Sequence, residues 1–198
     1  MTPRTAEKKR WTAEEYLEME RAADEKHEFY QGEIFAMAGA SYEHNLIVGN
    51  IAGELRNALR RRPCTVLPSD MKVRVAASGL YTYPDVTALC GPPQFADSKK
   101  DVLLNPGVIF EVLSTTTESY DRGAKFQQYR TIPSLAELAF VSQTKVLVEH
   151  FTRQEEGTWL LRERHAGDQL QLRSLDCEIA VDEIYLKVFE LAATESLK

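Results

Sequence analysis

The chain has 198 residues, 43% of them hydrophobic and 27% charged, which is typical of a globular protein and long enough for one substantial core. Its formal net charge of −6 excludes a protein that coats nucleic acid with its whole surface, but a local site with a bound divalent cation is compatible with that charge. The apolar runs are too short and too often interrupted by charges to span a membrane, and the basic N-terminus lacks the apolar stretch of a secretory signal.

The N-terminal segment predicts a tail followed by a short helix. Residues 1–10 predict a flexible basic tail. Residues 11–22 predict a helix in which Thr12 is the N-cap and Glu15, three residues later, completes a capping box.

A hairpin and a long helix come next. Residues 27–41 predict two strands that turn at Gln31 and Gly32. From Ser41 onward apolar residues recur at helical spacing, and Pro63 ends this helix because proline cannot continue its hydrogen bonds.

The remaining elements are mostly strands. Strands are predicted over 64–69, 71–77, 82–90, 107–114, 135–142, 145–152, 158–164 and 169–175. Helices are predicted over 121–130 and 181–192, with loops over 91–107 and 114–123.

This order of elements predicts an α/β (α+β) fold, with one domain over residues 11–198. The hydrophobic central strands, and the helix between the strands at 107–114 and 135–142, indicate a mixed sheet with both faces covered. The later strands add a C-terminal antiparallel β segment, with hairpin turns expected at RQEEG and AGD.

Three cysteines, Cys64, Cys90 and Cys177, are widely spaced along the chain. None belongs to a CxxC or Cys/His ligand pattern, so no zinc site is expected. The simplest expectation is reduced thiols in a cytoplasmic protein. We expect no organic cofactor.

The most informative residue is Glu111, a carboxylate inside the apolar run GVIFEVLS. Burial of a carboxylate costs free energy unless the group is paired, hydrogen-bonded or bound to a metal. A second acid, Asp85, follows Pro84 in the earlier strand 82–90. Strand alternation places Asp85 on one face with Thr87 and Leu89, and Glu111 on one face with Ile109 and Leu113.

Pairing of these two strands in the right register would bring the two carboxylates together. Mg²⁺ and Mn²⁺ prefer oxygen ligands, so Asp85 and Glu111 are candidate metal ligands, and the carbonyl of Val112 is a further candidate. The alternative for Glu111 is a buried ion pair with an arginine or lysine. The alternative for Asp85 is an acid in a turn after Pro84.

Two cationic residues are candidates for the same site. Lys125 shares a helix face with Asp121 and Tyr129, and its ammonium could stabilise negative charge that develops on a phosphate. Its alternative is a solvated lysine paired with Asp121. His44 begins the long helix on its apolar side and is a peripheral candidate, the alternative being a hydrogen-bonded core or cap histidine.

Several of these residues together resemble the Uma-two-type endonucleases of the restriction-endonuclease-like, PD-(D/E)xK superfamily. The similarity covers nearly the whole chain from Trp11, and includes the segment GEIFAMAGAS followed by His44. The other residues that carry it are Tyr83, Pro84, Asp85, Phe110, Glu111, Val112, Leu113, Ser114, Thr117, Tyr120, Asp121, Arg122, Gly123, Lys125 and Tyr129.

The resemblance implies a mixed central sheet flanked by helices and metal-dependent cleavage of phosphodiester bonds, with Asp85 and Glu111 as metal ligands. The superfamily lysine lies two residues after the second acid, where this chain has Leu113. Lys125 resembles the migrated lysine of this branch, and Lys72 is a weaker substitute.

We therefore predict an Mg²⁺- or Mn²⁺-dependent endonuclease that acts on DNA. Asp85, Glu111 and Lys125 are its catalytic residues, with His44 and Tyr129 peripheral. The resemblance also makes a homodimer plausible, with contact through the C-terminal β segment. One alternative is a catalytically inactive module on the same fold that binds nucleic acid or protein, because fold alone does not establish activity. Another is a hydrolase of a small phosphoester.

Overall fold

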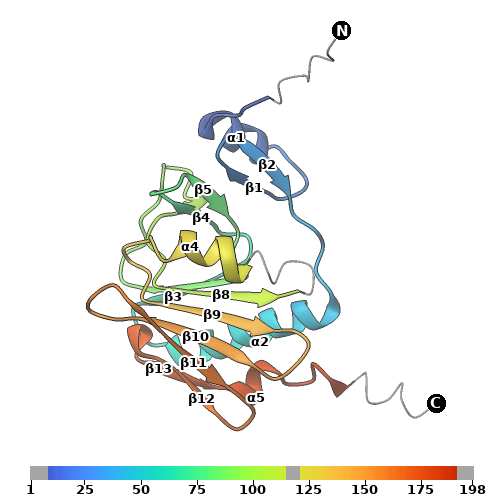
Figure 1. The fold of residues 1–198 in the computed structure, drawn as a ribbon, viewed down its shortest axis with the longest axis vertical. Coiled ribbons are helices and arrows are strands. Elements are labelled where there is room, and N and C mark those ends of the chain that lie inside the picture. Colours follow the sequence, from blue (N-terminus) through green and yellow to red (C-terminus); the bar gives the residue numbers. More distant parts are fainter. Residues whose placement is uncertain (1–8, 115–120, 191–198) are drawn as a thin grey trace, which may run out of the picture.

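The computed structural model describes residues 9–114 and 121–190, and Figure 1 shows the arrangement of its helices and strands. Most of the predicted tail, the centre of the loop before Asp121 and the end of the predicted last helix lie outside the described residues. The described strands form three sheets, two of which lie on either side of the short helix α4 (Phe126–Tyr129).

The largest sheet has six strands in the order β11-β10-β9-β8-β6-β3. They are β11 (Trp159–Arg164), β10 (Val148–Arg153), β9 (Glu137–Ser142), β8 (Val108–Leu113), β6 (Val86–Cys90) and β3 (Cys64–Pro68). β8 and β9 run parallel and the other neighbours run antiparallel. The prediction of a mixed sheet is therefore confirmed.

The second sheet has five strands in the order β2-β1-β5-β4-β7. They are β2 (Glu33–Ala36), β1 (His27–Tyr30), β5 (Leu80–Thr82), β4 (Lys72–Val75) and β7 (Val102–Leu103). β7 lies inside the segment predicted to be a loop. The turn between β1 and β2 is at Gln31 and Gly32, as predicted, and both residues have a positive φ.

The single strand predicted over 82–90 is wrong, because β5 and β6 belong to different sheets. The chain passes from one sheet to the other through Tyr83, Pro84 and Asp85. Proline has no N–H for a strand ladder, which explains why the strand is interrupted there. Asp85 consequently lies at the junction of the two sheets.

The helices are α1 (Ala13–Glu20), α2 (Tyr42–Leu59), the π-helical turn η1 (Asp121–Lys125), α4, the 3₁₀ turn η2 (Arg173–Leu175) and α5 (Val181–Ile184). The capping box of α1 is confirmed, since Thr12 and Glu15 bond each other's backbone N–H. α5 is shorter than the predicted terminal helix. Lys187 has a φ of 64°, a left-handed conformation that a right-handed helix cannot contain.

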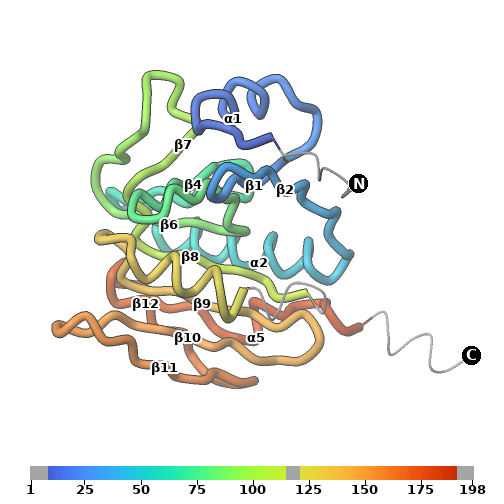
Figure 2. The backbone as a smooth tube through the Cα atoms, turned by 45° about the horizontal axis from the view of Figure 1, so that its top comes forward, coloured from blue at the N-terminus to red at the C-terminus, as the bar shows by residue number. Residues whose placement is uncertain are grey.

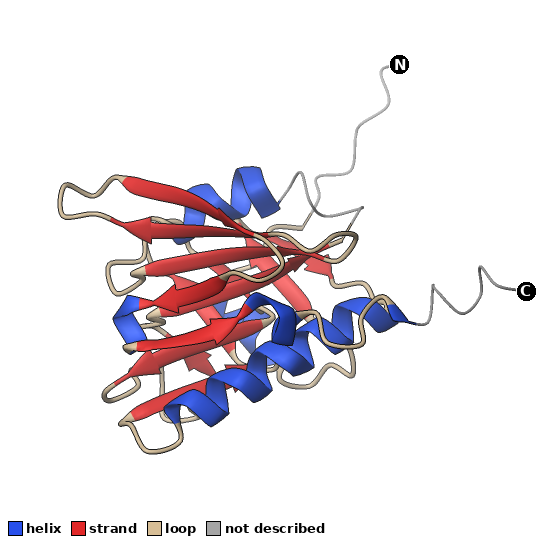
Figure 3. Cartoon of the chain, turned by 90° about the horizontal axis from the view of Figure 1, so that it is seen from below, coloured by secondary structure: helices blue, strands red, loops and turns tan. Residues whose placement is uncertain are grey.

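Both faces of the central strands β6, β8 and β9 are buried, apart from Cys90 at the end of β6. On one face α2 and the C-terminal elements pack on alternate residues of β6, β8 and β9 (Figure 3). On the other face Ile109, Leu113 and Leu89 pack with residues of β4, β5 and α4. The predicted alternation along β6 and β8 is therefore confirmed. α1 covers the outer face of the five-stranded sheet, away from the six-stranded sheet (Figure 2).

The predicted C-terminal β segment is present, but its pairing is different from the expected succession of hairpins. RQEEG joins β10 to β11, whereas β12 (Gln169–Leu172), which follows AGD, pairs with β13 (Cys177–Ala180). The sequence did not predict β13. Within 9–114 and 121–190, no helix is long and apolar enough to cross a membrane.

The expectation that all three cysteines are reduced is wrong. Cys64 on β3 lies directly opposite Cys90 on β6, and the two form a disulfide. Directly opposed residues of antiparallel strands have neighbouring Cβ atoms, so this pairing follows from the register of the strands. Cys177 is a free cysteine.

Candidate active site

Asp85 and Glu111 meet where the chain enters β6. Val86 pairs with Phe110, and one further step of this antiparallel register puts Asp85 opposite Glu111. Residues opposite each other in a sheet project from the same face. The Asp85 Oδ2 atom also accepts a hydrogen bond of 2.7 Å from the backbone N–H of Val112. The two predicted acids therefore lie together on the face of the sheet that is turned towards α4.

Glu111 is buried, with 4% of its surface exposed. Its Oε1 atom accepts a hydrogen bond of 2.5 Å from the hydroxyl of Tyr129 and lies 3.1 Å from the ammonium of Lys125. Burial raises the pKa of Glu111 to about 8, with smaller contributions in the same direction from Asp85 and Asp121. Burial therefore disfavours the charged form of this carboxyl group, while the Lys125 ammonium favours it.

Lys125 is the cationic centre of the site. Its Nζ atom lies 3.1 Å from Glu111 Oε1, 3.2 Å from Glu28 Oε1 and 3.6 Å from Asp121 Oδ1. Burial by itself would lower the pKa of Lys125, but the neighbouring carboxylates, above all Glu111, raise that pKa well above its ordinary value. The side chain is a buried ammonium, and its contact with Asp121 is the longest of the three.

The π-helical turn η1 presents Lys125 to the site. Such turns interrupt the regular helical repeat and are frequent at functional sites. Here η1 directs both Asp121 and Lys125 inward, and α4, which follows, carries Tyr129 to Glu111. The short segment after β8 thus supplies two of the contacts of Glu111.

His44 and Asp85 are joined across the edge of the site. His44 Nε2 lies 3.2 Å from Asp85 Oδ2, and the backbone N–H of His44 is capped by the Ser41 hydroxyl at 3.1 Å. The Nδ1 atom of His44 is buried and has no hydrogen-bond partner within the described part of the chain. The side chain of His44 is thus aimed at the carboxylate of Asp85.

Glu28 belongs to the same cluster, although no pattern in the sequence selects it. It lies on β1, is 9% exposed, and accepts a hydrogen bond of 2.5 Å from the Thr82 hydroxyl. Alternation along the hairpin puts Glu28 on a face with Tyr30, but sequence alone does not show what that face contacts.

Lys72, the weaker substitute for the catalytic lysine, takes part in another network. Its ammonium donates a hydrogen bond of 2.9 Å to the hydroxyl of Tyr83 and lies 3.9 Å from Asp101. Burial lowers the pKa of Lys72. Of the two candidate lysines, Lys125 is the one in contact with Glu111.

The donor atoms of the site suit a hard divalent cation. Four carboxylates, Asp85, Glu111, Glu28 and Asp121, surround one ammonium and the imidazole of His44, so an added cation would reduce the excess of negative charge. Within residues 9–114 and 121–190, no group of three His, Cys, Asp or Glu side chains is arranged to hold a metal. Two carboxylates and a main-chain carbonyl, completed by water and phosphate, are a common set for Mg²⁺.

Comparison with known proteins identifies the family of this chain. The model of the Uma2 family, described as "Putative restriction endonuclease", matches residues 13–182. Two relatives come from Synechocystis sp.: "Uncharacterized protein slr1290" is 38% identical over 173 residues, which are 87% of this chain and 90% of the relative. "Uncharacterized protein sll1609" is 41% identical over 152 residues, which are 77% of this chain and 86% of the relative.

A solved structure has the same fold. It is a "putative nuclease belonging to DUF820" from Anabaena variabilis, and it superposes with a TM-score of 0.70. The comparison covers 88% of this chain and 97% of the other, at 11% sequence identity. At this identity the likeness shows the arrangement of the elements alone.

Proposed function

This chain belongs to the Uma2 family, described as "Putative restriction endonuclease", and we propose that it is an endonuclease that hydrolyses phosphodiester bonds in DNA with Mg²⁺ or Mn²⁺. One observation carries the proposal. Asp85 and Glu111, which are far apart in sequence, lie opposite each other with the Lys125 ammonium 3.1 Å from Glu111. Two acids and a cation are the groups that metal-assisted phosphoryl chemistry needs.

Each residue has a distinct part in this proposal. The carboxylates of Asp85 and Glu111 and the carbonyl of Val112 would hold the cation. When bound, the cation would act as a Lewis acid on the phosphate and lower the pKa of water. The ammonium of Lys125 would stabilise the negative charge that develops on the phosphate oxygens. Tyr129 and His44 would orient Glu111 and Asp85 through the contacts described above.

The alternative of an inactive module with this fold rests on the displaced lysine together with the acidic net charge. Leu113 occupies the position two residues after Glu111, and its side chain cannot act electrostatically. The contact of Lys125 with Glu111 supports catalysis, because an ammonium is present beside the second acid although it comes from another element.

Cleavage of supercoiled plasmid tests the proposal. The wild type, Asp85→Asn and Glu111→Gln are incubated with Mg²⁺, with Mn²⁺ or with chelator, beside Glu163→Gln as a control. Glu163 is an exposed acid on β11. We expect the wild type and the control to nick DNA only with metal, and the two site variants to be at least about 100-fold slower. Equal, negligible cleavage by all four proteins would favour the inactive module, and a parallel assay on RNA would identify the preferred nucleic acid.

A homodimer and a cytoplasmic location stay predictions. β11 is an edge strand of the six-stranded sheet, and it exposes Leu160 and Leu161. An exposed apolar edge strand favours pairing with a second copy, and light scattering of the purified protein would measure the mass. The Cys64–Cys90 disulfide weakens the argument from reduced thiols that led to a cytoplasmic location.

A further inference from the structure

Glu28 and Thr82 are cross-strand neighbours in the five-stranded sheet. Phe29 on β1 pairs with Tyr81 on β5, so the antiparallel register continues with Glu28 opposite Thr82. The hydroxyl of Thr82 donates a hydrogen bond of 2.5 Å to Glu28 Oε1. Thr82 is completely buried and Glu28 nearly so. A buried carboxylate that accepts a hydrogen bond of this kind is fixed in orientation.

The same oxygen of Glu28 lies 3.2 Å from the ammonium of Lys125. Lys125 is therefore held between two carboxylates from different sheets, with Glu111 on β8 on one side and Glu28 on β1 on the other. Of the other two contacts of Lys125, Glu111 is a proposed metal ligand and Asp121 belongs to the same helical turn as Lys125. Glu28 is neither.

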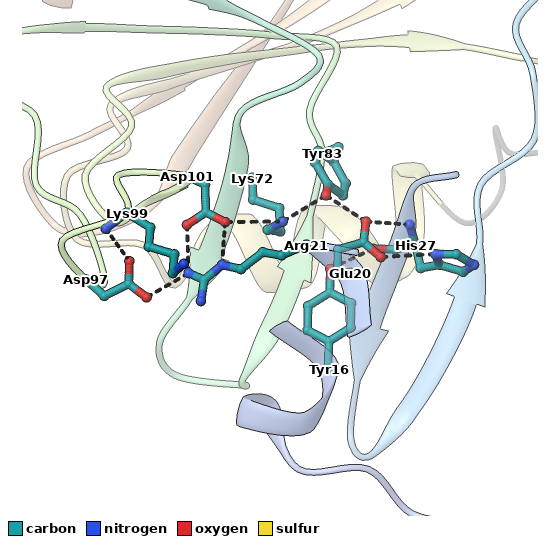
Figure 4. A network of polar contacts seen from close by, with 9 residues as sticks. All are labelled: Tyr16, Glu20, Arg21, His27, Lys72, Tyr83, Asp97, Lys99 and Asp101. Carbon is teal, nitrogen blue, oxygen red and sulfur yellow. Dashed lines mark hydrogen bonds and ion pairs between the residues drawn. The ribbon is translucent and has the colours of Figure 1, made fainter. Parts of the chain in front are cut away.

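A second network fixes the strand neighbours of Glu28 and Thr82. The carboxylate of Glu20 accepts hydrogen bonds from the Tyr83 hydroxyl at 2.7 Å and from the backbone N–H of His27 at 2.9 Å (Figure 4). His27 precedes Glu28 and Tyr83 follows Thr82. Because alternate residues of a strand point to opposite faces, Glu20 ties the two strands together on one face while Glu28 and Thr82 meet on the other.

Cation binding would change the balance of contacts around Lys125. A divalent cation on Glu111 would share the negative charge of that carboxylate and repel the nearby ammonium. Glu28 is held by its hydrogen bond from Thr82 and is separate from the proposed metal ligands, so the cation would leave its contact with Lys125 in place. Glu28 can therefore retain Lys125 beside the reacting phosphate.

We propose that Glu28, oriented by Thr82, is a positioning residue that holds the Lys125 ammonium in place when Glu111 binds the cation. This inference rests on the proposed nuclease function. Glu28 acts through Lys125, so its effect should disappear when Lys125 is removed.

A double-mutant cycle tests that dependence. We expect Glu28→Gln to lower the kcat of plasmid cleavage by about 10- to 100-fold, with little change in KM. In the Lys125→Met background, Glu28→Gln should cause no further decrease in kcat. An equal decrease in both backgrounds would overturn the proposal, because Glu28 would then act independently of Lys125. Glu163→Gln is the matched control in each background.

A second readout uses the metal-free protein and needs no cleavage. A buried, ion-paired ammonium gives a resolved signal in a ¹H–¹⁵N correlation spectrum of lysine side chains, and the signal of Lys125 is identified by its absence in Lys125→Met. We expect this signal to be lost or strongly shifted in Glu28→Gln and unchanged in Glu163→Gln. An unchanged signal in Glu28→Gln would overturn the proposed placement. If the wild type fails to cleave any nucleic acid, the proposed function fails, while the spectrum still reports on the placement of Lys125.

Thr82 provides variants that preserve the fold if Glu28→Gln is unstable. Thr82→Val removes the hydroxyl at nearly constant volume, and Thr82→Ser keeps the hydroxyl. We expect Thr82→Val to lower kcat by about tenfold and Thr82→Ser to retain most of the activity. Wild-type kcat in Thr82→Val would contradict the proposed orientation of Glu28 by Thr82.

Discussion

The carboxylate of Asp85 accepts a hydrogen bond of 2.7 Å from the backbone N–H of Val112, the residue directly after Glu111. This contact joins the point where the chain leaves the five-stranded sheet to the central strand of the six-stranded sheet. It also holds the carboxylate of Asp85 beside Glu111, because Glu111 and Val112 are consecutive residues of β8, the strand that pairs with β6. The carbonyl of Val112 belongs to the same short stretch of backbone.

Metal binding should depend on pH, because Glu111 must lose a proton to bind a cation. Burial raises the pKa of Glu111 to about 8, and the groups that face it are Asp85, Asp121, Lys125 and Tyr129. The affinity for Mn²⁺ should therefore rise about tenfold per pH unit up to about pH 8 and level off above it. Titration of Mn²⁺ followed by electron paramagnetic resonance measures this, and an affinity independent of pH would contradict it.

Removal of the Lys125 ammonium should impair catalysis more than metal binding. We expect Lys125→Met to lower kcat by about 100- to 1000-fold while the protein still binds Mn²⁺. Lys125→Arg should not restore activity, because a planar guanidinium differs in shape from the ammonium that the three carboxylates surround. Single-turnover cleavage gives the rate, and wild-type kcat in Lys125→Met would contradict the assigned role.

His44 should affect the cation site through Asp85. Loss of the contact at 3.2 Å frees the Asp85 side chain, so His44→Ala should weaken Mn²⁺ binding by about tenfold. The cap of α2 should persist, because Ser41 bonds the backbone N–H of residue 44. His44→Gln, which keeps a side-chain N–H, serves as the conservative control. Unchanged Mn²⁺ affinity in His44→Ala would show that this histidine has only a structural part.

The disulfide should stabilise the fold without taking part in catalysis. Cys64 and Cys90 are separated by 26 residues in sequence, a span for which a cross-link stabilises a protein by about 3 kcal/mol. Asp85 precedes β6, and Cys90 ends it. The Cys64→Ser/Cys90→Ser variant should therefore unfold at lower urea concentration and keep its kcat, with Cys177→Ser as control. An unchanged urea midpoint would argue that the bridge contributes nothing to stability.

The sequence predicts β8 as a short apolar run that is buried on both faces, and strand alternation assigns its side chains to those faces. Ile109, Glu111 and Leu113 share one face of β8, and Leu89 shares the corresponding face of β6. An acid on such a face is therefore recognisable from the pattern. The break between β5 and β6 at Pro84 could also have been predicted from the sequence, since proline is disfavoured inside a strand.

Residues whose roles depend on long-range register could not be predicted in the same way. Glu28 lies 54 residues from Thr82 in sequence, and its role follows from the pairing of β1 with β5 and from the position of η1. The Cys64–Cys90 pair likewise depends on the register of β3 against β6. Local pattern shows which face a side chain occupies, but not which element lies opposite that face.

The central claim is that Asp85 and Glu111 hold one divalent cation together. Anomalous diffraction from crystals grown with Mn²⁺ tests this claim most directly, because the metal is located independently of activity. We expect one strong anomalous peak within coordinating distance of both carboxylates and of the Val112 carbonyl, which disappears in Glu111→Gln. A peak elsewhere at saturating Mn²⁺, or none within reach of both Asp85 and Glu111, would contradict the account.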